Sequence, residues 1–180
     1  MNRMNSRKTR GLYYTGNGDS GFSFTLKRRL RKSSDLMEAI GDIDELQAFL
    51  GYAENKTKED GVRSLIRDII HDLYMLNAEL AGFKKDTFSP DRTKKLERLI
   101  NSYAKRIKPL YSFTYPIGVE SAVILNICRT IARRAERRIV KVCDNKSILS
   151  YINRLSSLLY VLYRYENERH HLEYGVLKFK

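Results

Sequence analysis

One stretch of the sequence most constrains the fold: residues 119–143 contain neither glycine nor proline. Apolar residues recur there at every fourth position: Val119, Val123, Ile127, Ile131, Ala135 and Ile139. An α-helix has about 3.6 residues per turn, so this spacing favours one side of a helix. We therefore expect a long helix over about 119–142 whose apolar stripe packs into a core.

A second stripe runs beside the first and carries Asn126, Arg129, Arg133 and Arg137. On a helix these guanidinium groups form one column, with neighbours about 6 Å apart. Glu136 lies three residues after Arg133, a spacing at which it can hold the Arg133 side chain in place. The ordinary interpretation of such a column is a solvated basic face. The sharper one is a phosphate site, because the guanidinium group suits phosphate oxygens.

The rest of the chain repeats the amphipathic pattern with few breakers. We expect further helices over about 35–55, 59–83, 91–108 and 147–168, with Phe83 closing the apolar stripe of the second. Short connections between long amphipathic helices are typical of a helical bundle. The sequence thus predicts an all-α, five-helix protein forming one domain over 1–180. Residues 1–12 would be a mobile basic tail, 13–34 a phosphate-binding segment and 35–172 the bundle.

The formal net charge of +13 indicates an anionic partner. Nucleic acid, a membrane surface and a phosphorylated small molecule all fit that charge. No apolar run approaches about 18 residues, so we expect no membrane span. The N-terminal residues lack the apolar segment of a signal peptide. Cys128 and Cys143 fall in one predicted helix, ~22 Å apart along its axis, which excludes a disulfide between them. Reduced cysteines favour a cytoplasmic location.

A glycine-containing segment precedes the first predicted helix. Thr15, Gly18, Asp19 and Gly21 lie in it, and a basic run follows over 27–32. Glycines let backbone N–H groups approach a ligand closely, which phosphate sites use. The segment lacks the Gly-Lys-Ser/Thr ending of a Walker A motif, and an ordinary turn is the alternative.

Four separated motifs then share one pattern: Y-T-G-N-G-D-S-G (14–21), E-A-I-G-D-I-D-E-L (38–46), R-T-I-A-R-R-A-E-R-R (129–138) and Y-I-N-R-L-S (151–156). In order and spacing they resemble the PduO-type ATP:cob(I)alamin adenosyltransferases. The resemblance implies a ferritin-like five-helix bundle that assembles as a homotrimer, with active sites between subunits. It also implies transfer of the 5′-deoxyadenosyl group of ATP to cob(I)alamin, release of triphosphate, and bound Mg²⁺.

The resemblance also implies roles for individual residues. A first set would wrap or contact the triphosphate of ATP: Thr15, Gly18, Asp19, Gly21, Lys27 and Lys32. Arg129 would pair with Asp44 of a neighbouring subunit. Arg133 and Glu136 would hold ATP and its Mg²⁺, and Asn153 would lie in the nucleotide pocket. Phe113 would cover the lower face of cobalamin and keep the axial base off cobalt.

The sequence departs from the family pattern at several positions. Thr25 and Leu26 stand where a Gly-Gly pair is common, and Phe22 where a small polar residue is usual. Ile117 replaces a loop glycine, and Asn126 stands where a histidine often precedes the arginines.

Two alternatives remain, the first from another class of protein and the second from the same family. One is a basic helical module that binds nucleic acid; it leaves Asp44, Asn153 and the glycine segment without a role. The other is a relative that binds cobalamin or ATP without turnover. For the enzyme, we expect a flavoprotein reductase and an adenosylcobalamin-dependent enzyme as partners, and neither a membrane nor nucleic acid.

Overall fold

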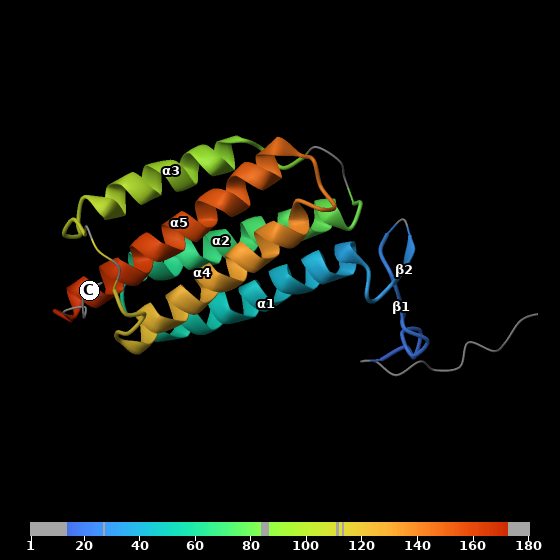
Figure 1. Cartoon of the computed structure of the whole chain (residues 1–180), viewed down its shortest axis with the longest axis horizontal. Helices are drawn as coiled ribbons and strands as arrows, with labels where there is room; N and C mark the ends of the chain where they lie inside the picture. The colour runs from blue at the N-terminus through green and yellow to red at the C-terminus, as the bar shows by residue number, and fades with distance from the viewer. Residues whose placement is uncertain (1–13, 27, 84–86, 111, 113, 173–180) are drawn as a thin grey trace, which may run out of the picture.

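The computed structural model describes residues 14–26, 28–83, 87–110, 112 and 114–172. Five α-helices dominate it: α1 Asp35–Lys56, α2 Asp60–Leu80, α3 Asp91–Ala104, α4 Glu120–Ile139 and α5 Lys146–Arg169 (Figure 1). The predicted all-α, five-helix fold is therefore confirmed. The calls on Lys27, Phe113 and the 1–12 tail lie outside the described residues.

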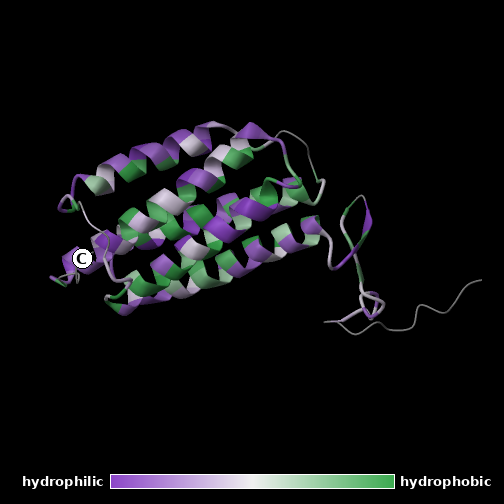
Figure 2. Cartoon of the chain, viewed as in Figure 1, coloured by the Kyte–Doolittle hydropathy of each residue, from purple (hydrophilic) through white to green (hydrophobic). Residues whose placement is uncertain are grey.

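The helices run along one long axis, and helix α4 lies between α1 and α5 and packs against both (Figure 1). Helix α2 packs on α1, and α3 lies on the outer side of α5. Hydrophilic and hydrophobic segments alternate along each helix (Figure 2). Buried side chains from all five helices form the core, among them Ile43, Leu73, Leu96, Leu125 and Leu159. Within the described residues, no helix is both long and apolar enough to cross a membrane.

Helix α2 ends earlier than the apolar pattern predicts. Gly82 has φ +88°, and its N–H donates to Glu79 O, while Phe83 N–H donates to Ala78 O. This pair of bonds is a Schellman motif, which ends a helix at a glycine. Phe83 is consequently 67% exposed. The prediction that Phe83 closes the apolar stripe of this helix is therefore wrong.

The expected apolar stripe of α4 is correct only in its C-terminal half. Ile131, Ala135 and Ile139 are buried, but Ile127 is 37% exposed. A strict four-residue repeat advances about 40° around a helix at each step, so the stripe drifts off the core face. Towards the N-terminus the core takes a different set: Ile124, Leu125 and Cys128.

A small antiparallel hairpin precedes the bundle. The prediction of an all-α fold did not include it. Strands β1 Phe22–Phe24 and β2 Arg29–Arg31 pair with Phe22 opposite Arg31. The Arg29 guanidinium lies 4.2 Å from the centroid of the Phe22 ring, a cation–π contact across the two strands. The hairpin lies at the end of the bundle where α1 begins (Figure 1).

Candidate active site

A cleft of about 720 Å³ opens between α4, α5 and the segment that joins α3 to α4. Helix α4 lines it with Asn126, Arg129 and Arg133. The other walls are apolar, aromatic or hydroxyl-bearing: Leu110, Ser112, Thr114 and Pro116 from the segment, and Ser156, Ser157, Tyr160, Val161 and Tyr163 from α5. One wall is therefore cationic, and the wall facing it is largely uncharged.

The cationic wall follows from helical spacing, since positions 126, 129 and 133 share one side of α4. Asn126 is buried, and its Oδ1 accepts a hydrogen bond from Arg129 Nε at 2.8 Å. That bond orients the guanidinium and leaves its two Nη groups for a ligand. Among the described residues, neither Arg129 nor Arg133 has a carboxylate partner. The column predicted from the sequence thus presents two unneutralised guanidinium groups to the cleft.

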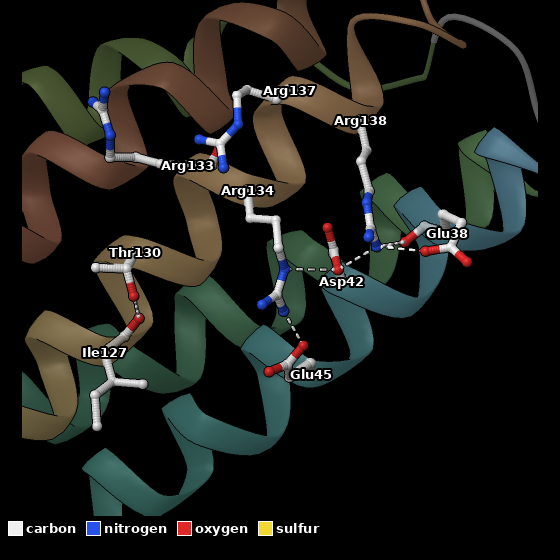
Figure 3. A network of polar contacts seen from close by, with 9 residues as sticks. All are labelled: Glu38, Asp42, Glu45, Ile127, Thr130, Arg133, Arg134, Arg137 and Arg138. Carbon is white, nitrogen blue, oxygen red and sulfur yellow. Dashed lines mark hydrogen bonds and ion pairs between the residues drawn. The ribbon is translucent and has the colours of Figure 1, made fainter.

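Two further arginines of α4 face the other way, towards α1 (Figure 3). Arg134 Nε lies 3.0 Å from Asp42 Oδ1, and the same side chain pairs with Glu45. Arg138 Nη1 lies 2.8 Å from Asp42 Oδ1 and 2.7 Å from Glu38 Oε2.

In the same view Arg133 and Arg137 extend away from these acids, and Arg137 Nη1 donates to Arg133 O (Figure 3). The single arginine column expected from the sequence does not include this division. The spacing of Glu38, Asp42 and Glu45 along one side of α1 is the signal that indicates it.

Glu136 has a different partner from the one expected. Its Oε1 accepts from Asn153 Nδ2 of α5 at 2.7 Å, and no contact with Arg133 is formed. The expectation that Glu136 holds the Arg133 side chain is therefore wrong here, because the Asn153 amide faces Glu136 across the α4–α5 interface. Arg154 Nη1 in turn donates to Asn153 Oδ1 at 2.7 Å, and Arg154 Nε pairs with Glu97 at 3.0 Å. Two predicted site residues, Glu136 and Asn153, are thus brought together.

Asp44 lies on a different side of α1 from Asp42. It is exposed, and its Oδ1 accepts from Asn77 Nδ2 of α2 at 2.9 Å. Within one chain Asp44 makes no ion pair among the described residues and does not meet Arg129. The pairing of these two residues across a subunit boundary stays a prediction.

The glycine segment and Lys32 form a compact unit. Gly21 N–H donates to Gly18 O at 3.1 Å, and Lys32 N–H donates to Gly21 O at 2.9 Å. A Cβ on Gly18 would lie 2.9 Å from Lys32 Nζ, so the end of the Lys32 side chain lies directly against the Gly18 backbone. Thr15 Oγ1 accepts from Asn17 N–H, and Asp19 N–H donates to Gly16 O. None of these residues lines the arginine cleft; within one chain the two predicted phosphate sites are separate.

The structure shows the contacts of Asn126 and Ile117, two residues that depart from the family pattern. The Asn126 amide oxygen accepts a hydrogen bond from Arg129 and thereby orients its guanidinium group. Ile117 is 51% exposed, and its carbonyl oxygen accepts hydrogen bonds from Tyr163 and Asn167 of α5. Burial raises the pKa of Tyr163, so its phenol stays neutral and remains a hydrogen-bond donor.

The bundle and its cleft define a class: a helical protein with guanidinium groups facing an open site of small-molecule size. The family model for cobalamin adenosyltransferase matches residues 13–166. The chain is 36% identical to the corrinoid adenosyltransferase PduO of Salmonella typhimurium, over 88% of this chain and 50% of that protein. It is 34% identical to the corrinoid adenosyltransferase of Bacillus subtilis, over 87% of this chain and 86% of the relative. This protein therefore belongs to the cobalamin adenosyltransferase family.

A solved structure of a related protein has the same fold. A variant PduO-type ATP:corrinoid adenosyltransferase from Lactobacillus reuteri, complexed with cobalamin and ATP, superposes with a TM-score of 0.84 at 28% identity. The match covers 92% of this chain and 96% of that one. The chain spans half the length of the Salmonella relative, which is thus a longer protein.

Proposed function

We propose that this protein transfers the 5′-deoxyadenosyl group of ATP to cob(I)alamin. The Co(I) electron pair forms the new cobalt–carbon bond to C5′, the C5′–O5′ bond breaks, and its electron pair leaves on triphosphate. The observation that carries the proposal is the cleft in which Arg129 and Arg133 lie without carboxylate partners among the described residues. Family membership and the relatives' names support the same reaction.

For this reaction the protein needs only to position the two substrates and to stabilise the charge on the leaving triphosphate. Cobalt in cob(I)alamin is itself the nucleophile, so no general base is needed. Arg129 and Arg133 would stabilise the negative charge that grows on the leaving triphosphate. They would act from a rigid helix, which fixes the donors before the reaction begins.

We propose further that the ATP site forms between subunits of a homotrimer. The glycine segment would bring Thr15, Gly18, Asp19, Gly21, Lys27 and Lys32 to the cleft of a neighbour. That neighbour would contribute Arg129, Arg133, Glu136 and Asn153. The separation of the two sets within one chain supports this arrangement, as does the exposure of Asp44, which would pair with Arg129 across the boundary.

Mg²⁺ fits this site only together with ATP. Within the described residues no group of three or more His, Cys, Asp or Glu side chains is placed to hold a metal ion. Mg²⁺ commonly uses one or two carboxylates together with substrate phosphates. Glu136 meets that need, because Oε1 is bonded to Asn153 and Oε2 has no partner among the described residues. Bound there, the ion would neutralise part of the phosphate charge.

Cobalamin would occupy the less charged side of the cleft. Leu110, Pro116 and Val161 supply apolar surface there, next to the position of Phe113 in the chain. We propose that Phe113 covers the lower face of cobalamin and keeps the axial base away from cobalt. An apolar side chain suits that task because it offers the metal no ligand.

The remaining proposals concern the cellular setting. We propose one domain over 1–180, a cytoplasmic location, a flavoprotein reductase that supplies the Co(I) state, and an adenosylcobalamin-dependent enzyme that receives the product. A nucleic-acid module is the less favoured alternative, since Arg134 and Arg138 pair with acids of α1 and Arg129 and Arg133 line a concave cleft.

A spectroscopic assay tests the proposed reaction. Protein, ATP and Mg²⁺ are mixed with chemically reduced cobalamin, and absorbance follows the change to an alkylcobalamin spectrum. We expect conversion that requires ATP and releases one triphosphate per cobalamin. Binding of both substrates without conversion would identify a non-turnover relative instead. Salt-sensitive binding of DNA or RNA, with no binding of ATP or cobalamin, would favour the nucleic-acid module.

A further inference from the structure

One wall of the cleft is a connecting segment rather than a helix. Residues 105–119 join α3 to α4, and Leu110, Ser112, Thr114 and Pro116 line the cleft. A segment without regular structure keeps its position only if its backbone groups are bonded to the scaffold. The last two turns of α5 supply such bonds at both ends of the lining residues.

The first attachment lies before the lining residues, at Lys108. Its carbonyl oxygen accepts from Arg164 Nη2 at 2.6 Å, and its N–H donates to Glu168 Oε2 at 2.8 Å. Arg164 and Glu168 are one turn apart on α5 and pair with each other at 2.9 Å. Both backbone groups of Lys108 are therefore held by a single ion pair.

The second attachment follows the lining residues and uses the adjacent column of α5. The Tyr163 hydroxyl lies 2.9 Å from Ile117 O and 3.2 Å from Tyr115 O, and donates to these carbonyls. Asn167 Nδ2 donates to Ile117 O at 3.2 Å, and Asn167 Oδ1 accepts from Val119 N–H at 3.0 Å. Tyr163 is 2% exposed and Asn167 is fully buried, so both side chains are fixed by the packing of α5.

Gly118 shows how closely the segment follows Asn167. A Cβ at this position would overlap the Asn167 carboxamide, and the backbone has φ +155°. The main chain passes directly over the amide, at a distance that only glycine permits. The 115–119 backbone is thus built around the Asn167 side chain.

We propose that Tyr163 and Asn167 are positioning residues for cobalamin, acting through the segment they hold. This inference rests on the proposed function, which places cobalamin against that wall. Arg129 and Arg133 are fixed by α4 and do not depend on these bonds. Loss of the α5 contacts would therefore disturb the cobalamin side of the cleft and leave the ATP side intact.

The test compares two buried tyrosines of α5, of which only Tyr163 bonds the segment through its hydroxyl. Tyr163→Phe removes the hydroxyl that bonds the segment. Tyr151→Phe is the matched control, because Tyr151 is fully buried and its hydroxyl has no hydrogen-bond partner in the part of the chain that the structure describes. For Tyr163→Phe we expect KM for cobalamin to rise about tenfold, as loss of one hydrogen bond can produce. KM for ATP stays within about twofold in both variants on the same reasoning.

Hydrogen exchange provides a second measurement that needs no activity. The backbone amides of Thr114, Tyr115 and residues 117–119 should exchange faster in Tyr163→Phe and in Asn167→Ala than in the parent protein, and at an unchanged rate in Tyr151→Phe. Unchanged exchange, equal losses for ATP and cobalamin, or equal effects of the two tyrosine substitutions would overturn the inference. If the parent protein fails to transfer the adenosyl group, the proposed function fails, while exchange still decides whether α5 holds the segment.

Discussion

At the scale of single residues, the environment of each arginine decides its role. Arg134 and Arg138 face Asp42 and are neutralised within the chain. Arg129 and Arg133 face the cleft, and Arg129 is oriented by a buried amide rather than by a carboxylate. An amide orients a guanidinium group without cancelling its charge, which keeps the group available for phosphate.

Arg133→Ala should weaken ATP binding by about 10- to 100-fold, since hydrogen bonds to charged groups contribute about 1.5–3 kcal/mol. Arg133→Lys should recover little of that loss, because an ammonium group does not reproduce the planar fork. Calorimetric titration with ATP measures both variants. Arg67→Ala serves as the control, since Arg67 is an exposed arginine of α2 paired with Glu54. Unchanged ATP affinity and turnover in Arg133→Ala would remove Arg133 from the site.

Phe113 should matter most for reactions that start from Co(II). The Phe113→Ala protein should bind ATP normally and keep its melting temperature, while losing rate from Co(II) with a reductant. Reactions started from Co(I) should suffer less, because Co(I) has already lost its axial base. The measurement is the pair of rates beside a melting curve. Equal losses in both rates, together with a large drop in melting temperature, would make Phe113 an ordinary core residue. Such a drop would correspond to a loss of about 3–5 kcal/mol in the free energy of unfolding.

At the scale of elements, the Asp42 cluster is the principal polar contact between α1 and α4. Asp42 is 3% exposed and accepts from two guanidinium groups (Figure 3). Its replacement leaves Arg134 and Arg138 without their shared acceptor. Both arginines are about a third exposed, so solvent limits the loss.

Asp42→Ala should lower the free energy of unfolding by roughly 2–3 kcal/mol, less than for a fully buried pair. The control is Asp60→Ala, because Asp60 pairs with Arg63 at 3.3 Å but its side chain is 96% exposed. The control should cost about 0–1 kcal/mol. Urea unfolding curves give both values, and equal costs for the two substitutions would contradict a structural role for the cluster.

Periodicity predicted the five helices well, and local backbone chemistry decided the details it missed. The apolar repeat of α2 continues to Phe83, but the Schellman motif at Gly82 ends the helix before it. The predicted α4 stripe includes Ile127 because it follows a strict four-residue repeat. Positions in such a repeat move gradually around the helix and leave the core face. The positions of Arg129 and Arg133 were predictable from spacing alone. The partner of Glu136 was not, since Asn153 reaches it from another helix.

At the scale of the whole molecule, assembly is the property that a single chain shows only indirectly. The glycine segment lies at the end of the bundle, apart from the cleft (Figure 1). Asp44 is exposed and carries a charge that no described residue of its own chain neutralises. Both features would be accounted for by a ring of subunits, in which each chain completes the site of the next.

The protein should sediment as a trimer at micromolar concentration, and a stable monomer would exclude the proposed assembly. If Asp44 and Arg129 pair at the boundary, either single alanine substitution should cost roughly 3–5 kcal/mol, because it leaves one charge buried and unpaired. The double substitution should cost less than the sum of the two. Strict additivity in this mutant cycle would show that the pair does not form.

Complementation between subunits tests whether the active site forms between neighbouring chains. Lys32→Ala impairs the glycine segment and Arg133→Ala impairs the cleft, so each variant alone should be nearly inactive. In trimers formed by coexpressing the two, random assembly of a ring leaves about a quarter of the sites with both halves intact. We expect recovery of about that fraction of the parent's adenosyl transfer rate, again from the statistics of ring assembly. A mixed preparation no more active than the two separate variants would contradict it.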